Sequence, residues 1–252
     1  MWIQQGTAMA NISRTWLSLP SLGLILLLLL VWSTNSAAQL RPFEATYSSQ
    51  WDVGISLSGQ AQRSLISNSD GSFLLTTKAT AMVASLTESS LFNYQEGAII
   101  PRHYQYQRKI LNKTRDVQVA FDWAGQQVTN TAQGKAWKMA IVPHTLDKQS
   151  VQLRLQLDLK AHPKEAAYAY NVADGGLLKT YRFIADGEDP VETPLGKYSA
   201  IRIKRDRGTD SDRQTWIWFA PALDYSIVRI VQQEADGKRY QLNLKQLTWL
   251  DG

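Results

Sequence analysis

Apolar and polar residues alternate with a period of two along most of the chain between residues 43 and 249. Such alternation indicates β-strands that bury one face. Turn sequences such as Asn68-Ser69-Asp70-Gly71 and Asp236-Gly237 separate the alternating segments, and Asn, Asp and Gly tolerate the left-handed backbone of tight hairpins. We therefore predict a mainly β fold, built as a single antiparallel, strongly curled sheet or a half-open β-barrel.

One segment, residues 147–161, departs from this pattern in composition. Its leucines alternate as they would in a strand, but it is rich in Leu, Gln, Arg and Lys, which favour helices, and poor in β-branched residues. Asp147 fits a helix N-cap and His162-Pro163 a helix stop. We predict one helix over about residues 147–161.

The C-terminal third contains an acidic segment, Asp186-Gly187-Glu188-Asp189. Its composition is that of a hairpin turn. A calcium site is the alternative, but Ca²⁺ takes six or more oxygen ligands and this segment offers only a few. We predict a turn here, and another at Pro194-Leu195-Gly196.

The N-terminal segment has the pattern of a secretory signal peptide. Arg14 precedes an apolar run at residues 22–32, and Ser36 and Ala38 match a cleavage site. The run is shorter than the about 20 residues that a membrane-spanning helix needs. We expect residues 1–38 to be removed and residues 39–252 to form a single β-rich periplasmic domain, with no stable transmembrane segment after cleavage. An uncleaved anchor is the alternative, and Met9 is an alternative start to Met1.

The chain contains no cysteine. Lipid attachment after signal cleavage would need one, so we do not expect a lipoprotein. Disulfides, thiolate catalysis and cysteine-ligated metals are excluded for the same reason. Burial of a hydrophobic core must therefore stabilise the domain.

Positive charge is concentrated in two stretches of a chain whose net charge is +5. The basic residues of these stretches are Arg102, Arg108, Lys109, Lys113 and Arg115, and then Lys197, Arg202, Lys204, Arg205, Arg207 and Arg213. Strands with one solvated face account for such residues without any partner. The functional interpretation is a patch for lipid head groups or other envelope polyanions. We expect no nucleic-acid binding, because the chain is exported and carries no nucleic-acid-binding motif.

The three histidines, His103, His144 and His162, lie in no catalytic or metal-binding motif. A catalytic histidine needs an orienting partner, and the sequence shows none. G-x-S-x-G, P-loop and G-x-G-x-x-G motifs are also missing from the sequence. We expect no catalytic residues, no metal site and no cofactor, and a non-enzymatic role is favoured.

Trp216 and Trp218 are separated by one residue and therefore share one face of a strand, while Thr215, Ile217 and Phe219 share the other. Both faces are apolar, which indicates that both are covered. Core packing is one interpretation, since large aromatic residues usually lie in interiors. The other is a cavity for a lipophilic molecule, which makes Trp216 and Trp218 the candidate ligand-binding residues.

Three blocks in fixed order resemble a family of exported bacterial proteins, the domain of unknown function 3108. They are Tyr170-Asn171-Val172-Ala173-Asp174-Gly175, Glu192-Thr193-Pro194-Leu195-Gly196 and Trp216-Ile217-Trp218-Phe219-Ala220-Pro221 with Val228-Arg229-Ile230. The resemblance covers about residues 42–249. It implies a periplasmic β-rich domain and no established activity. A half-open barrel like those of lipoprotein carriers is a looser analogy, and a shared fold does not imply a shared function.

These observations favour a non-catalytic envelope protein that binds a lipophilic or amphiphilic ligand, or an envelope partner, in a curved β-sheet. An envelope hydrolase with scattered acid and base residues is one alternative. A structural assembly factor without a ligand is the other. The sequence does not predict the oligomeric state.

Overall fold

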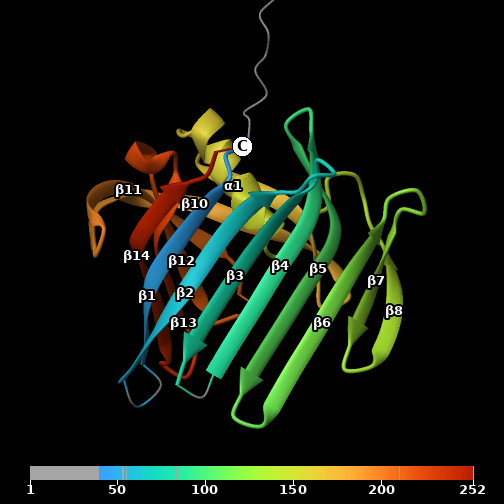
Figure 1. Ribbon diagram of the computed structural model, residues 1–252, viewed down its shortest axis with the longest axis horizontal. Coiled ribbons are helices and arrows are strands. Elements are labelled where there is room, and N and C mark those ends of the chain that lie inside the picture. Colours follow the sequence, from blue (N-terminus) through green and yellow to red (C-terminus); the bar gives the residue numbers. More distant parts are fainter. Residues whose placement is uncertain (1–39, 53, 55, 83, 210, 252) are drawn as a thin grey trace, which may run out of the picture. The chain divides into compact units, whose positions relative to one another are not determined.

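The fold is described from a computed structural model. It describes residues 40–52, 54, 56–82, 84–209 and 211–251. Within these residues the chain forms one large antiparallel sheet and one α-helix (Figure 1). The predicted mainly β architecture, a single curled antiparallel sheet with one helix, is confirmed. The predicted signal peptide lies outside the described residues, and its cleavage stays a prediction.

Eight strands precede the helix. They are β1 (Phe43–Asp52), β2 (Ser56–Ser67), β3 (Phe73–Ala81), β4 (Ala84–Gln95), β5 (Ala98–Ile110), β6 (Lys113–Asp122), β7 (Gln127–Ala132) and β8 (Lys135–Ala140). The helix α1 (Ser150–Ala161) follows. Six strands and a short 3-10 helix complete the chain: β9 (Ala167–Asp174), β10 (Leu177–Thr193), β11 (Gly196–Asp206), β12 (Gln214–Ala220), η1 (Pro221–Leu223), β13 (Ser226–Gln233) and β14 (Arg239–Trp249).

The strand order of the described sheet is β8-β7-β6-β5-β4-β3-β2-β1-β14-β13-β12-β11-β10-β9. Strands that are consecutive in the sequence are therefore neighbours in this sheet, except for β8 and β9. β1 pairs with β14 as well as with β2, so the first and last described strands meet in the middle of the sheet. β8 and β9, which flank α1 in the sequence, are the two edges.

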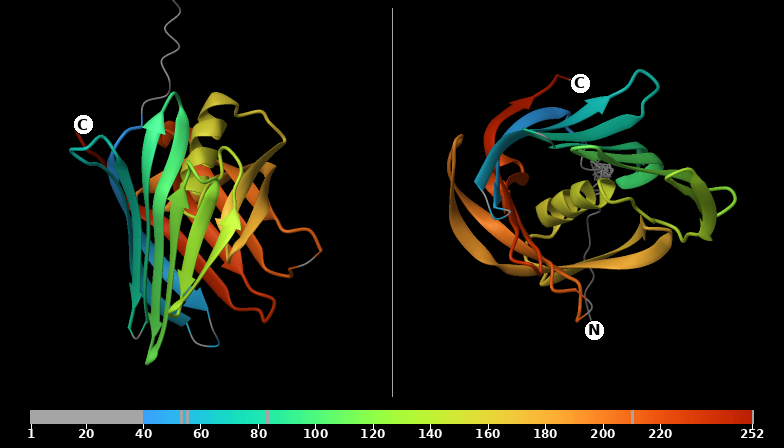
Figure 2. Two further views of the ribbon diagram at one scale, coloured as in Figure 1. Left: turned by 90° about the vertical axis from the view of Figure 1, so that its right-hand side faces the viewer. Right: turned by 90° about the horizontal axis from the view of Figure 1, so that it is seen from below.

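The two edges approach each other without pairing. Leu146, just before α1, forms a parallel bridge to β9, in which its N–H donates to Asn171 and its C=O accepts from Ala173, both at 2.8 Å. Trp137 of β8 packs on Gly176 in the β9–β10 turn, where an added Cβ would lie 2.0 Å from the indole nitrogen. These contacts hold the sheet in a deep curve around the helix (Figure 2).

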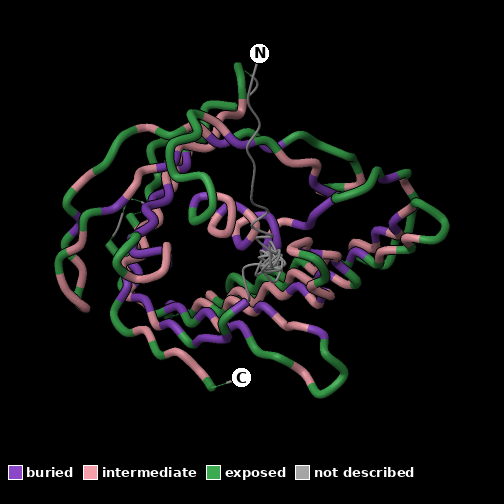
Figure 3. The backbone as a smooth tube through the Cα atoms, turned by 90° about the horizontal axis from the view of Figure 1, so that it is seen from above, coloured by how far each residue is buried: buried purple, intermediate pink, exposed green. Residues whose placement is uncertain are grey.

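The main core lies between α1 and the concave face of the sheet. Val151, Leu155 and Leu159 of the helix are completely buried, as are Leu75 of β3 and Phe92 of β4. Seen from above, the helix lies within the curve of the sheet (Figure 3). The helix prediction is confirmed over Ser150–Ala161, but the N-cap is Gln149 and not the predicted Asp147. Asp147 lies two residues earlier and accepts hydrogen bonds from the N–H groups of Gln149 and Ser150.

The predicted turn at Asp186-Gly187-Glu188-Asp189 is wrong. β10 continues through it, and a bulge between Ala185 and Glu188 absorbs the irregularity. Gly187 adopts a φ of +111°, which a bulge can use and which side chains disfavour. Arg202 of the neighbouring strand binds Asp186 (Nε to Oδ2, 3.0 Å) and Asp189 (Nη1 to Oδ2, 2.7 Å). The acidic residues thus bind an arginine of the next strand, 13 to 16 residues away in the sequence.

Candidate functional site

The concave face of the sheet is the face that curves around α1 (Figure 3). Arg63 of β2 donates to Gln152 of the helix (3.0 Å), and the strand register assigns other residues to the same face. Across β3, β4 and β5 the register runs from Arg63 to Thr77, Glu88 and Tyr106. In the other direction, from β1 to β11, it runs from Ser49 to Leu242, Ile230, Ile217 and Ile203.

The helix covers only one end of this face. Beyond it, towards the β3–β4 and β5–β6 hairpins, the concave residues are half-exposed and mostly aromatic or aliphatic. They are Trp51, Leu57, Leu86, Tyr106, Ile230, Tyr240 and Leu242. Trp51 and Tyr240 pack edge to face across the β1–β14 pair, with ring centroids 5.8 Å apart. Ile230 and Leu242 pack against the main core at one border of this surface, and the ammonium of Lys148 lies 5.3 Å from the centre of the Tyr106 ring at another. The described chain leaves the rest of the surface half-exposed.

A polar network anchors the N-terminus of α1 to the sheet. Asp147 accepts hydrogen bonds from the N–H groups of Gln149 and Ser150, both at 2.8 Å, and from the hydroxyl of Ser90 at 2.6 Å. Glu88 accepts from the amide of Gln149 (2.9 Å) and the hydroxyl of Tyr104 (2.5 Å). Burial raises the pKa of Asp147 to about 6, although the hydrogen bonds lower it. Both carboxylates therefore hold the helix in place.

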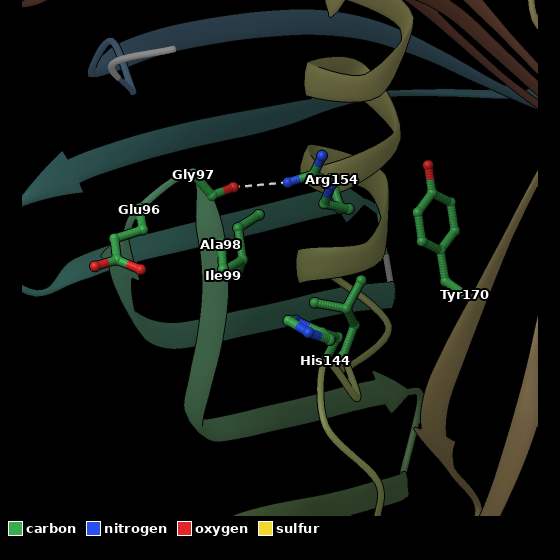
Figure 4. Close-up of a pocket in the computed structure, with 8 residues that line it drawn as sticks. Glu96, Gly97, Ala98, Ile99, His144, Arg154 and Tyr170 are labelled. Carbon is green, nitrogen blue, oxygen red and sulfur yellow. Dashed lines mark hydrogen bonds between the residues drawn. The ribbon is translucent and has the colours of Figure 1, made fainter. Parts of the chain in front are cut away.

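A pocket of about 460 Å³ lies between the β4–β5 hairpin, the loop that precedes α1, α1 itself and β9 (Figure 4). Its lining residues are Glu96, Gly97, Ala98, Ile99, His144, Leu146, Arg154 and Tyr170. Arg154 donates to the carbonyl of Gly97 at 2.7 Å and pairs with Asp158, which also accepts from Tyr170 at 2.7 Å. The pocket's arginine and tyrosine are thus already engaged with the protein.

Trp216 and Trp218 lie on the convex face of β12, opposite Ile217, which faces the helix side. The indole of Trp218 donates to Asp189 at 2.9 Å, and the guanidinium of Arg229 lies 5.9 Å from its ring. Arg229 also donates to the carbonyl of Glu192 in the β10–β11 hairpin at 2.8 Å, so this hairpin covers the tryptophan face. The tryptophan face is thus covered at Trp218, which is 9% exposed, but only in part at Trp216, which is half-buried.

The histidines are dispersed. His103 lies in β5, His144 in the loop before α1 and His162 at the end of α1, where its carbonyl accepts from Tyr168 at 2.6 Å. Among the described residues, no group of three or more His, Asp or Glu side chains lies close enough to hold a metal ion. In the same part of the chain, no helix has the length and apolarity needed to cross a membrane.

Sequence comparison places the chain in a family. The model of the protein family of unknown function DUF3108 matches residues 72–245. The chain belongs to the DUF3108 family. A comparison with curated proteins gives no match for this DUF3108 protein.

The solved structures that resemble this DUF3108 protein include a β-barrel-like protein of the domain of unknown function DUF1849 from Brucella abortus. It has a TM-score of 0.58 and 11% identity, over 84% of this chain and 99% of that one. This likeness shows the fold alone. A DUF1329 protein from Desulfovibrio piger (TM-score 0.27, 7% identity, 86% and 88% covered) and a Vibrio parahaemolyticus domain named for outer membrane lipoprotein sorting (0.25, 10%, 84% and 86%) are too distant to establish a shared fold.

Sequence reasoning did not identify the concave aromatic and aliphatic residues as a group. Alternation shows which residues of one strand share a face, but not which face curves around the helix.

Proposed function

We propose that this protein is an exported, non-catalytic binding protein that holds an amphiphile on the concave face of its sheet. The observation that carries the proposal is the half-exposed aromatic and aliphatic surface beyond α1, from Trp51 to Leu242. Burying such surface against an acyl chain is favourable by about 25 cal/mol per Å². A curved sheet of the DUF1849 type is compatible with this role, although the fold does not imply it.

Titration of the purified domain with a fluorescent fatty acid tests the proposal. We expect saturable binding that Leu86→Asn weakens about tenfold, since a lost leucine-sized contact costs about 1.5 kcal/mol. Ile66→Asn is the matched control, because Ile66 is 41% exposed and lies on the opposite face of β2 from Leu65. Binding that is absent, or unaffected by Leu86→Asn, would contradict the proposal.

The sequence-based assignment of Trp216 and Trp218 to the ligand site remains a separate proposal. Their convex position means that a ligand would have to enter beneath the β10–β11 hairpin. Trp216→Ala and Trp218→Ala should then weaken fatty acid uptake more than they lower the free energy of unfolding. A full core-sized loss of stability, about 3–5 kcal/mol with unchanged uptake, would make the residues packing residues.

Export is part of the proposed function. Cleavage after Ala38 should release a domain that begins at Gln39 into the periplasm. N-terminal sequencing of the protein from a periplasmic fraction checks this. Recovery of the intact chain only after detergent extraction would contradict it.

A further inference from the structure

Two neighbouring hairpins expose apolar side chains at the end of the sheet far from α1. They connect β3 to β4 and β5 to β6 (Figure 1). Met82 is 87% exposed, Leu111 is 62% exposed and Ile110 is 40% exposed. Ala84 lies opposite Ile110 in the β4–β5 register, so the two hairpin tips are side by side. Large apolar side chains that gather at an exposed edge mark an interaction site.

The backbone of both tips is unusual for apolar residues. Met82 has a φ of +30° and Leu111 a φ of +51°, in the left-handed region that Gly, Asn and Asp adopt more readily. At two other hairpins of the described chain, Glu96-Gly97 and Gln133-Gly134, polar residues and glycine hold the left-handed positions. Because Met82 and Leu111 are also exposed, neither turn geometry nor core packing accounts for their apolar side chains.

The same tips carry a block of positive charge. Residues 108–115 include Arg108, Lys109, Lys113 and Arg115 and no acidic residue. Arg108 and Arg115 lie opposite each other in the β5–β6 register, a pairing of like charges that destabilises a sheet. All four cations are exposed, and within the described part of the chain none of them forms an ion pair. An anionic partner would relieve this repulsion.

We propose that the β3–β4 and β5–β6 hairpins dock on the surface of a bilayer that contains anionic phospholipids. The apolar side chains stand at the tips and the cations are set back along β5 and β6. Met82 and Leu111 therefore enter the boundary of the acyl chains, while Lys109 and its basic neighbours stay among the phosphate groups. A stable protein complex buries about 1,200–2,000 Å², which requires a broader face than two hairpin tips.

The docking goes beyond the proposed function and stands without it. The two are adjacent in the fold, because Leu86 of the half-exposed concave surface lies opposite Arg108 of the basic block. Docking thus brings that end of the concave face to the bilayer, which makes the bilayer the source or the acceptor of the amphiphile. This last step alone rests on the proposed function.

Vesicle co-sedimentation of residues 39–252 tests the docking. One set of vesicles is pure phosphatidylcholine, and the other is an equimolar mixture of phosphatidylcholine and phosphatidylglycerol. We expect binding to the anionic vesicles to be at least about tenfold tighter than to the neutral ones. The preference should shrink as the salt concentration is raised, because salt screens exposed charges.

A matched pair of double variants isolates the apolar tips. Met82→Asn/Leu111→Asn should weaken binding to anionic vesicles about tenfold, since the variant loses both inserted side chains. Asn tolerates the left-handed backbone, so the variant should remain folded. The control is Ile66→Asn/Val142→Asn, which removes two apolar residues that are 41% and 40% exposed and lie outside both tips. The control should bind within about twofold of the parent.

A second pair isolates the cations. Lys109→Gln/Lys113→Gln should remove most of the preference for anionic vesicles. Lys164→Gln/Lys245→Gln lowers the net charge equally at two exposed positions, one just after α1 and one in β14. It should leave the preference within about twofold of the parent. Urea unfolding verifies that all four variants are folded.

The remaining outcomes overturn the docking or separate it from the proposed function. Equal binding to the two kinds of vesicle would overturn it, as would equal losses in the tip variants and their controls. Failure to bind either vesicle would also overturn it and would point to an acidic protein as the partner. Uptake of the fluorescent fatty acid without vesicles reports on the proposed function alone, so its absence would leave a positive docking result standing.

Discussion

At the scale of single residues, Asp147 makes the stability of the domain depend on pH. Burial raises its pKa to about 6, whereas an unfolded aspartate has a pKa of about 3.9. The folded state therefore binds this proton more tightly, and the contribution of Asp147 to stability is greatest below about pH 4. That contribution is lost as the pH rises through about 6.

Asp147→Asn removes this titration while keeping a helix-capping side chain. We expect the free energy of unfolding of the parent, measured relative to that of the variant, to fall by about 2–3 kcal/mol between pH 4 and pH 7. Urea melts of both proteins at several pH values check this. A difference that stays constant, or rises, with pH would show that the carboxylate is not desolvated.

The sequence predicted Asp147 as the helix cap from its position before a run of helix-forming residues. It could not show that Ser90 and the sheet enclose the carboxylate, because that contact joins β4 to α1. The same limit applied to Met82 and Ile110. Both were visible in the sequence, but their proximity became known only from the register of β4 and β5.

At the scale of elements, the β10 bulge depends on Arg202. Its ion pairs with Asp186 and Asp189 are about one-third exposed, so solvent reduces their strength. Arg202→Gln should lower the free energy of unfolding by roughly 1–2 kcal/mol. It should also shift the fluorescence of Trp218, which binds the same Asp189.

Arg182→Gln is the control for Arg202→Gln. Arg182 lies in β10, the strand that contains the bulge, and its pair with Asp206 at 3.6 Å has an arginine side chain that is 60% exposed. We expect a loss below about 0.5 kcal/mol. Equal losses in the two variants, measured by urea unfolding, would contradict a specific role for the bulge.

Most strand positions were predictable from alternation, but this bulge was not, since its stabilising partner comes from the next strand.

At the scale of the whole molecule, the chain order does not follow the sheet order. During folding, β1 can pair its second edge only after β14, the last described strand, is available. A circular permutant that begins at Lys164 and joins the ends near Pro42 and Leu250, which are hydrogen-bonded at 3.0 Å, would make all sheet neighbours consecutive. Because local contacts speed folding, it should refold faster than the parent and retain the same far-UV circular dichroism. Stopped-flow refolding at the parent rate would contradict this.

The unpaired edges also make the stiffness of the sheet uneven. Elsewhere, neighbouring strands are joined by ladders, the shortest of which has four residue pairs between β11 and β12. Between the β8 and β9 sides, the described backbone bonds are the two made by Leu146. The curvature of the sheet can therefore increase or decrease at this seam without the loss of any strand pair. If the protein holds an amphiphile as proposed, this seam lets one chain accommodate ligands of different width.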